Sequence, residues 1–271
     1  MAHSCEVILP LGRSAPISIP RREPRITSTE RLGPVPAGTF EVLAKASAFL
    51  QALPEHLQLL VGQSATAVAL PVGTVLYEPG VRPRFVHFLT SGMASEVMEM
   101  GNGCTPEILT LGSEGVAEAT HLLGPSRVPS RAFMKISGTG LQMSFSAFER
   151  LFNEHPALRS VVLSYVQYRI ALLSQTAACN RLHGVQQRLA TYLLMVQDRT
   201  RSNSFILTQE FLADMIGTQR TTITHIARSL QRLGFIEYSR GKMIIRNREG
   251  LESAACECFR ATMNQVNTLY S

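Results

Sequence analysis

A polar and cationic helical face near the C-terminus is the feature of this chain best suited to chemistry. At about 100° per residue, the apolar positions fall on one face of a helix: Ile223, Ile226, Ala227, Leu230 and Leu233. The opposite face carries hydroxyl, imidazole and guanidinium groups and no carboxylate: Thr221, Thr224, His225, Arg228 and Arg232, with Arg220 at its flank. Hydrogen-bonding and cationic groups on such a face fit the major groove of duplex DNA.

Two helices and a tight turn position this face. The first helix is expected over 209–216 with Thr208 as its N-cap, and the second over 219–233 with Thr218 as its N-cap. Gly217 falls between them, where a tight turn needs a positive φ that glycine adopts without steric cost. The segment is therefore predicted to be a helix-turn-helix.

A short hairpin with a basic tip follows the second helix. Residues 235–238 and 243–246 are typical of strands, and Ser239-Arg240-Gly241-Lys242 supplies the turn. A helix-turn-helix followed by such a hairpin is a winged helix. The alternative is an ordinary amphipathic pair of helices with a solvated basic face.

The winged helix predicts two kinds of contact with DNA. Base edges would be reached from the N-terminal part of the second helix. The candidates for base contacts are Arg220, Thr221, Thr224 and His225. The candidates for phosphate contacts are Gln209, Thr222, Arg228, Arg240 and Lys242. Gln219 completes the set of DNA-binding candidates.

The composition of the whole chain favours a polyanionic partner. The 271 residues carry a formal net charge of +6, and 45% of them are hydrophobic, which is enough for two domains with buried cores. No apolar run is long enough to cross a membrane and no signal-peptide core is present, so a cytoplasmic protein is expected. We find no P-loop, Gly-x-Ser-x-Gly elbow or zinc-protease motif, which argues against an enzyme. Glu114 and Glu118 are interpreted as solvated loop carboxylates, not as an acid–base pair.

Short strand patterns punctuated by glycines occupy residues 65–145. Their period of two suggests an antiparallel barrel or jelly roll that could enclose one ligand. The turn glycines are Gly73, Gly80, Gly92 and Gly112, and Asn102-Gly103 is a strong hairpin signal. A helical turn at 118–123 could present free N–H groups to a phosphate, with Arg127 or Arg131 as the counter-charge. The alternative is a plain loop with solvated arginines.

Helical patterns flank the strand region. Residues 40–60 predict one or two short helices broken at Pro54, and 185–198 predict a helix that leads into the helix-turn-helix. Residues 156–180 carry an apolar stripe that predicts a dimerisation helix, with a buried intra-chain helix as the alternative. The stripe consists of Leu158, Val161, Val162, Tyr165, Leu172, Thr176 and Cys179.

Together these patterns predict an α+β fold. It has an N-terminal β-roll of the jelly-roll type, a long dimerisation helix and a C-terminal winged helix-turn-helix. The expected boundaries are 1–39 for a flexible tail, 40–155 for the roll, 156–183 for the helix, 184–250 for the winged helix and 251–271 for a helical tail.

The five cysteines are an odd number, which argues against a disulfide framework in a reducing compartment. The closest pair is Cys256-x-Cys258, and residues two apart on a helix do not face one another. We therefore interpret the cysteines as buried or partly exposed thiols and predict no metal site. A redox or metal role for Cys179, Cys256 and Cys258 is the alternative.

The order of these parts resembles the cyclic-AMP receptor/FNR (Crp/Fnr) family of bacterial transcription regulators, over about residues 40–250. The segment that most resembles the family is GTQRTTITHI at Gly217 to Ile226. It is followed by L-x2-L-G-F-I at Leu230 to Ile236. VGTVLYEPG at Val72 to Gly80 resembles the family's first roll strands, which belong to a cyclic-nucleotide-binding-like domain. The resemblance implies a homodimer that binds a near-palindromic DNA operator and contacts RNA polymerase.

The reading helix departs from the R-E-T-V-S-R that is common in the family. Arg220 keeps the first arginine, whereas Thr221 replaces the glutamate and His225 replaces the last arginine. Arg220 is therefore the best carried-over contact with a base or phosphate, and the operator is expected to differ from the family's usual one.

Two short segments resemble the cassette of the cyclic-nucleotide members, G-E-x-A followed by R-S/T-A. They are Ala117-Glu118-Ala119-Thr120 and Ser130-Arg131-Ala132, so Glu118 and Arg131 are the candidate ribose and phosphate contacts. The glycine is lost and the order around Arg131 is altered, so the resemblance permits a cyclic nucleotide but requires no cofactor. The N-terminal cysteine cluster of the iron–sulfur members is absent. One branch has A-A-C-N-x-x-H and A-A-C-E-C, which match Ala177 to His183 and Ala254 to Cys258.

The leading hypothesis is a dimeric transcription regulator controlled by an effector or redox signal sensed by the roll. The alternative from another class is a ligand-binding receptor whose C-terminal unit docks a protein. A steep loss of duplex-DNA affinity with salt would argue against that alternative. Unchanged DNA binding after thiol oxidation would argue against redox control.

Overall fold

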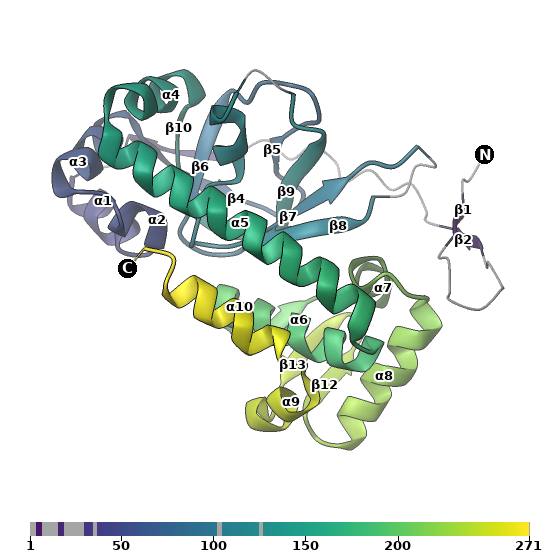
Figure 1. Cartoon of the computed structure of the whole chain (residues 1–271). Coiled ribbons are helices and arrows are strands. Elements are labelled where there is room, and N and C mark those ends of the chain that lie inside the picture. The colour runs from purple at the N-terminus through teal and green to yellow at the C-terminus, as the bar shows by residue number, and fades with distance from the viewer. Residues whose placement is uncertain are drawn as a thin grey trace. The chain divides into compact units, whose positions relative to one another are not determined.

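The structure is a computed structural model that describes residues 4–6, 16–18, 30–34, 37–101, 105–124 and 127–270 (Figure 1). The chain divides into two compact units. The roll unit comprises Pro24–Glu96, Leu109–Ser174 and Thr262–Ser271, and the winged-helix unit comprises Met1–Glu23, Val97–Ile108 and Gln175–Ala261. The expected Asn102-Gly103 turn lies outside the described residues.

Two four-stranded sheets form the β-roll. Their strands are β3 (Glu30–Pro34), β4 (Thr66–Leu70), β5 (Val75–Tyr77), β6 (Phe85–Leu89), β7 (Met93–Met98), β8 (Glu107–Leu111), β9 (Ser130–Ile136) and β10 (Gly138–Ser144). The strand order is β3-β4-β10-β6 in one sheet and β5-β9-β7-β8 in the other, and β10 pairs antiparallel with both β4 and β6. The predicted α+β fold with an N-terminal roll is confirmed. Strands β1 (Ser4–Glu6) and β2 (Pro16–Ser18) pair with each other.

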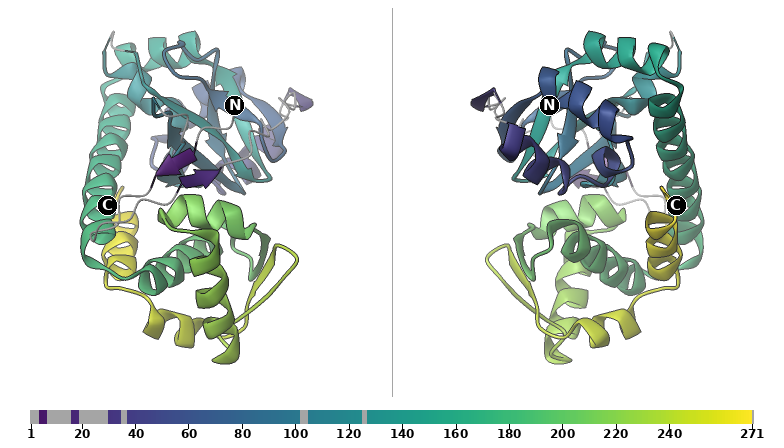
Figure 2. Two further views of the ribbon diagram at one scale, coloured as in Figure 1. Left: turned by 90° about the vertical axis from the view of Figure 1, so that its right-hand side faces the viewer. Right: turned by 90° about the vertical axis from the view of Figure 1, so that its left-hand side faces the viewer.

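The N-terminal part of the roll unit differs from the expectation in one respect. Helices α1 (Ala37–Ala44), α2 (Ala48–Gln51) and α3 (Glu55–Ser64) cover one side of the roll (Figure 2), and Pro54 is the N-cap of α3, as the predicted break implies. Strand β3, however, lies within the stretch expected to be a flexible tail. It pairs antiparallel with β4, because an edge strand offers unpaired N–H and C=O groups to a further strand.

An aromatic core joins the helices of the roll unit to its sheets. Its fully buried rings include Phe49 on α2, Phe88 on β6, Phe148 on α4 (Phe145–Glu154) and Tyr165 on α5 (Pro156–Leu182). The ring centroids of Phe49 lie 5.7 Å from Phe88, 6.3 Å from Phe148 and 6.4 Å from Tyr165. Tilted and edge-on pairs at such separations add to the stabilisation from buried area.

Tyr165 packs directly on a backbone position that only glycine can fill. A Cβ built on Gly115 would lie 1.9 Å from a ring carbon of Tyr165, which is far inside any van der Waals contact. The absence of a side chain at this position therefore lets the long helix approach the loop before η1, a 3₁₀ helix over Ala117–Leu122. This element is close to the helical turn expected at 118–123.

A buried polar network lies beside this aromatic core. Arg169 on α5 forms an ion pair with Glu96 on β7 and donates to the carbonyl oxygen of Ala117 at 3.1 Å. Ser130 Oγ donates to Glu96 Oε1 at 2.6 Å, and Tyr77 Oη lies 3.1 Å from Ser130 Oγ. Arg169 and Glu96 are only 4% and 3% exposed, so their charges depend on each other and on these hydrogen bonds.

The long helix buries the stripe that we expected at a dimer seam. Leu158 and Tyr165 have no exposed surface, because this face of α5 packs within the chain. Most of this stripe is therefore covered within the chain, whereas the dimerisation helix stays a prediction. A different apolar stripe is exposed: Leu163, Ile170 and Leu173 are 47%, 61% and 37% accessible. No helix among the described residues is long and apolar enough to cross a membrane.

The winged-helix unit follows the predicted order. Its elements are α6 (Val185–Thr200), β11 (Ser204–Ile206), α7 (Gln209–Ile216), α8 (Arg220–Arg232), β12 (Ile236–Ser239), β13 (Lys242–Ile245) and α9 (Arg248–Ala254). Helix α10 (Cys258–Asn267) begins in this unit. Strand β11, which was not predicted, pairs with β13 to complete the sheet β11-β13-β12. Helices α6 and α7 contact each other, with the ring centroids of Tyr192 and Phe211 6.4 Å apart.

Candidate nucleic-acid interface

A side-chain cap, a glycine with positive φ and a backbone hydrogen bond determine the geometry of the turn between α7 and α8. Thr208 caps α7, since its hydroxyl oxygen accepts a hydrogen bond from the N–H of Phe211 at 3.1 Å. Gly217 ends α7 in the left-handed conformation with φ 67° and ψ 51°, as predicted. The N–H of Thr218 then donates to the carbonyl oxygen of Ala213 at 2.9 Å, which closes the helix end.

Helix α8 begins one residue later than expected. Gln219, not Thr218, is its N-cap, and the Gln219 side chain makes no capping hydrogen bond. The first turn also contains no acidic residue. The N-terminal end of α8 therefore keeps unpaired backbone donors and the positive end of the helix dipole beside the exposed side chain of Arg220.

The two faces of α8 largely match the prediction. Ile223, Ala227 and Leu230 are buried. Leu233 is 56% exposed, against the expectation, because the helix has already ended there and Gly234 turns the chain with φ 74°. On the opposite face the exposed candidates are Gln219, Arg220, Thr221, His225 and Arg228, and the half-buried ones are Thr222 and Thr224.

Thr224 is engaged in holding the two helices together. Its hydroxyl lies 3.0 Å from Gln209 Oε1 on α7 and 3.0 Å from the carbonyl oxygen of Arg220. Two of the predicted DNA-binding residues, Gln209 and Thr224, therefore contact each other across the helix pair. This contact orients the Gln209 amide, whose NH₂ group remains a donor.

The wing has the expected hairpin with a two-residue turn. Arg240 and Gly241 have φ values of 50° and 81°, as a primed hairpin turn requires, and Ser239 pairs with Lys242. The side chains of Arg240 and Lys242 are exposed. The wing is attached to the start of the helix-turn-helix, because Leu207 N–H donates to the Gly241 carbonyl oxygen at 2.8 Å.

A cavity of about 470 Å³ lies between the wing and the two helices. Its lining residues are Thr208, Gln209, Glu210, Arg220, Tyr238, Arg240 and Gly241. Three predicted DNA-binding residues, Gln209, Arg220 and Arg240, therefore meet at one hollow. No sequence signal pointed to Tyr238, whose hydroxyl donates to the Leu207 carbonyl oxygen at 2.7 Å. Burial raises the pKa of Tyr238, and the positive charge of Arg220 opposes this shift.

Some arginines of the winged-helix unit form ion pairs with carboxylates, whereas the basic side chains of the candidate interface do not appear in the ion pairs of the described residues. Arg246 pairs with Glu237, and Arg248 pairs with Asp198 and Glu252. Among the described residues, by contrast, no ion pair involves Arg220, Arg228, Arg240 or Lys242. Unpaired cations on an exposed face can neutralise phosphates without first breaking an internal bond.

The two candidate effector contacts both have partners within the roll unit. Glu118 is fully buried, accepts from the His87 N–H at 3.1 Å and lies 2.7 Å from His87 Nδ1. Arg131 Nε lies 3.2 Å from Glu78 Oε2. An effector that used the Glu118 carboxylate would have to compete with its hydrogen bonds to His87. Glu114 is also buried, so neither it nor Glu118 is the solvated carboxylate that the sequence suggested. Arg127 lines a separate cavity of about 200 Å³ with His121 and Arg82.

Removing the cap of α7 is expected to weaken the winged helix measurably. Thr208→Ala leaves the Phe211 N–H without its partner and should lower the free energy of unfolding by about 1 kcal/mol. Thr218→Ala is the matched control, because Thr218 caps no helix, and its effect should stay within about 0.5 kcal/mol. Urea unfolding midpoints of the two variants would test this, and equal losses would contradict the assigned cap.

Comparison with known proteins identifies the domain and the fold. Residues 187–254 match the sequence model of the Crp-like helix-turn-helix domain. A crp/fnr-family transcriptional regulator from Eubacterium rectale is 15% identical and superposes with a TM-score of 0.62 over 78% of this chain and 98% of its own. FixK2 from Bradyrhizobium japonicum is 14% identical and superposes with a TM-score of 0.60 over 71% of this chain and 98% of its own. TTHA1359, a CRP/FNR-family regulator from Thermus thermophilus, is 19% identical and superposes with a TM-score of 0.58 over 70% of this chain and 97% of its own. No curated protein sequence matches the chain.

Proposed function

We propose that this chain, which has the Crp/Fnr-like fold and a Crp-like helix-turn-helix domain over 187–254, is a dimeric transcription regulator that reads a near-palindromic operator. One observation carries the proposal. The exposed face of α8 presents amide, hydroxyl, imidazole and guanidinium groups without a carboxylate, beside a basic wing tip. An enzyme active site is not needed to explain any of these residues.

The geometry supports a distinct role for each part of the interface. The uncapped N-terminus of α8 would enter the major groove, where Arg220, Thr221 and His225 reach base edges. Arg228 and the wing residues Arg240 and Lys242 would contact phosphates on either side. Thr222 and Thr224 are half-buried, and Thr224 also positions Gln209, which would donate to a phosphate oxygen.

Dimerisation would use the exposed stripe of α5. Leu163, Ile170 and Leu173 recur at intervals of seven and three residues, which is the spacing of a coiled-coil seam. The buried stripe of the same helix holds it in its own chain. The exposed stripe would therefore be the part that meets a second copy.

DNA binding by the dimer would be regulated through the roll unit. An effector or redox signal sensed by the roll unit would change the population of dimers that present both α8 helices correctly. Contact with RNA polymerase would then turn binding into a change of transcription in the bacterial cytoplasm.

Selection of random duplex DNA by the reduced protein would test this function. A two-fold symmetric site is expected, with half-sites about 10 base pairs apart, and affinity should fall steeply with salt. Light scattering of the selected complex should give two chains per duplex. Enrichment of no sequence at any salt concentration, together with weak and salt-insensitive binding, would contradict the proposal.

A further inference from the structure

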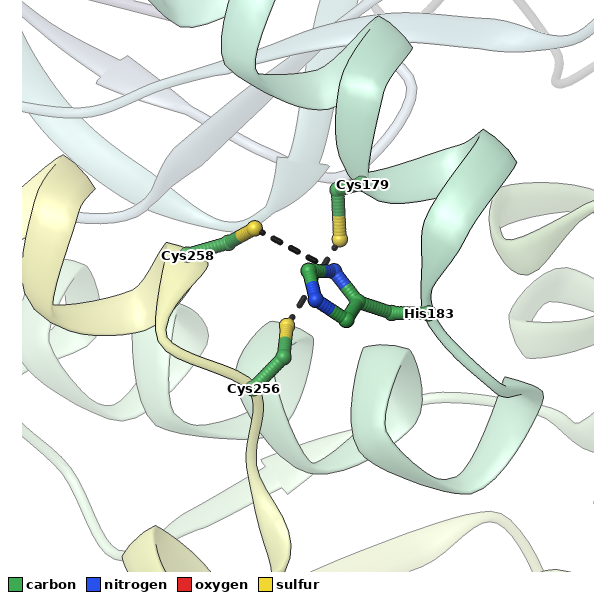
Figure 3. Close-up of side chains that lie close together, drawn as sticks. All are labelled: Cys179, His183, Cys256 and Cys258. Carbon is green, nitrogen blue, oxygen red and sulfur yellow. Dashed lines mark hydrogen bonds between the residues drawn. The ribbon is translucent and has the colours of Figure 1, made fainter.

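Three thiols and an imidazole from two distant segments meet inside the winged-helix unit (Figure 3). Cys179 lies in the last turns of α5, and His183 follows the end of that helix. Cys256 and Cys258 come from the junction between α9 and α10. The four potential ligand atoms all lie within 4.8 Å of one another, and the three cysteines are buried.

The local backbone explains how each pair of ligands faces the same point. Cys179 and His183 are four residues apart, and the His183 N–H donates to the Cys179 carbonyl oxygen at 3.0 Å, so both side chains share one helix face. We expected that Cys256 and Cys258 would point apart on a helix. That expectation is wrong, because α9 ends at Ala254 and α10 begins at Cys258, which leaves Cys256 in a non-helical link.

The distances within the cluster fit a single tetrahedral ion. Cys179 Sγ lies 3.6 Å from Cys256 Sγ, and Cys258 Sγ lies 3.4 Å from His183 Nδ1. Zinc–sulfur bonds of about 2.3 Å in tetrahedral geometry would place two sulfur ligands about 3.8 Å apart. We propose that Cys179, His183, Cys256 and Cys258 bind one Zn²⁺ ion as a closed Cys₃His site.

Groups around the four ligands support this site. His183 Nε2 lies 3.1 Å from Glu257 Oε1, so a carboxylate holds the outer ring nitrogen while Nδ1 faces the sulfur atoms. Zinc-bound histidines typically have such a partner, which fixes the tautomer. Gln175 Nε2 donates to Cys258 Sγ at 3.0 Å, and Thr191 Oγ1 lies 3.2 Å from Cys256 Sγ. Both contacts would stabilise thiolates.

Charge balance also fits. One Zn²⁺ with three thiolates and a neutral imidazole carries a net charge of −1, and forming it releases three protons without any oxidant.

Other uses of the cluster fit less well. An iron–sulfur cluster would need its cysteine sulfurs to span an inorganic core, whereas these atoms are close enough to share one ion. Four protein ligands with no open position indicate a structural zinc site, not a catalytic one. Such a site would stabilise the fold of the winged-helix unit whether or not the unit binds DNA.

Metal analysis of the full chain tests the proposal directly. Protein purified without a metal-binding tag in reducing buffer should contain about one zinc per chain and no stoichiometric iron. After chelation, added Co²⁺ should give the visible bands of a tetrahedral ion and a thiolate-to-cobalt charge-transfer band. Mass spectrometry should show the three cysteines reduced. Failure to bind either metal, an iron–sulfur chromophore, or a disulfide within the cluster would each overturn the proposal.

Two substitutions with matched controls locate the site. Glu257 is 78% exposed in its side chain, so Glu257→Gln should fold normally yet weaken zinc binding by about 10- to 100-fold in a chelator competition. Glu249→Gln removes an exposed carboxylate from α9 and should leave zinc affinity unchanged. His183→Asn should shift the Co²⁺ spectrum or abolish it, and His155→Asn in the roll unit should not. Equal effects of test and control variants would show that the metal binds elsewhere.

Discussion

Replacing Arg169 by methionine is expected to lower the free energy of unfolding by about 3–5 kcal/mol. The substitution leaves Glu96, which is 3% exposed, without a counter-charge and removes the donor to the Ala117 carbonyl oxygen. Burial alone would lower the pKa of Arg169, but Glu96 together with Tyr165 and Tyr77 more than offsets this effect, so the pKa is raised. Each charge of the pair therefore needs the other in order to stay buried.

Chemical unfolding followed by a roll-unit signal would measure this loss. Arg150→Met is the matched control, because Arg150 is an exposed arginine on α4 and its loss should change stability by less than about 0.5 kcal/mol. Combining Arg169→Met with Glu96→Gln should recover part of the loss, since no unpaired charge then remains. An Arg169 variant as stable as the Arg150 control would contradict the role of the buried pair.

Replacing Arg220 by alanine should cost about 1–3 kcal/mol on the selected operator, which is roughly a 5- to 150-fold loss of affinity. Arg220 is exposed at the uncapped N-terminus of α8 and lines the cavity shared with the wing. A guanidinium at this place can make a bidentate contact with a guanine or a phosphate that alanine cannot replace. Fluorescence anisotropy with labelled operator would give the ratio of dissociation constants.

The control for this variant is Arg232→Ala. Arg232 carries the same charge on the same helix but lies in its last turn, away from the end that enters the groove. Arg232→Ala should reduce the affinity for the operator less than Arg220→Ala does. It should also reduce the affinities for operator and random DNA by the same factor. If Arg220→Ala and Arg232→Ala bind the operator with equal affinity, then α8 does not read bases through its N-terminal end.

Features that depend on neighbouring residues were predictable from the sequence. The cap at Thr208, the positive φ of Gly217 and the Arg240-Gly241 turn each follow from short-range chemistry, and the structure contains all three. The strand region was also predictable, because a period of two indicates strands whatever covers them. Strand β11 (Ser204–Ile206) was missed because three residues are too short to show a period.

Features that depend on distant partners were not predictable. The helical wheel of α5 shows an apolar stripe, but it cannot say whether a second copy or the same chain covers that stripe. The sequence names Glu118 as a candidate effector contact, but it does not show that the Glu118 carboxylate also hydrogen-bonds to His87. His183 was not considered as a ligand because Cys258 is 75 residues away, although the spacing Cys-x3-His on a helix was a usable signal.

The chain enters and leaves the DNA-binding segment at one place. Cys179 Sγ and Cys256 Sγ are 3.6 Å apart, although 77 residues separate them. Local opening usually begins where a chain end is loose. Here the two ends of the segment, at Cys179 and Cys256, pack against each other. Neither end can therefore unfold without exposing the other. Partial unfolding would have to start at surface turns such as Arg240-Gly241, and proteolysis should reach those turns before it reaches the ends.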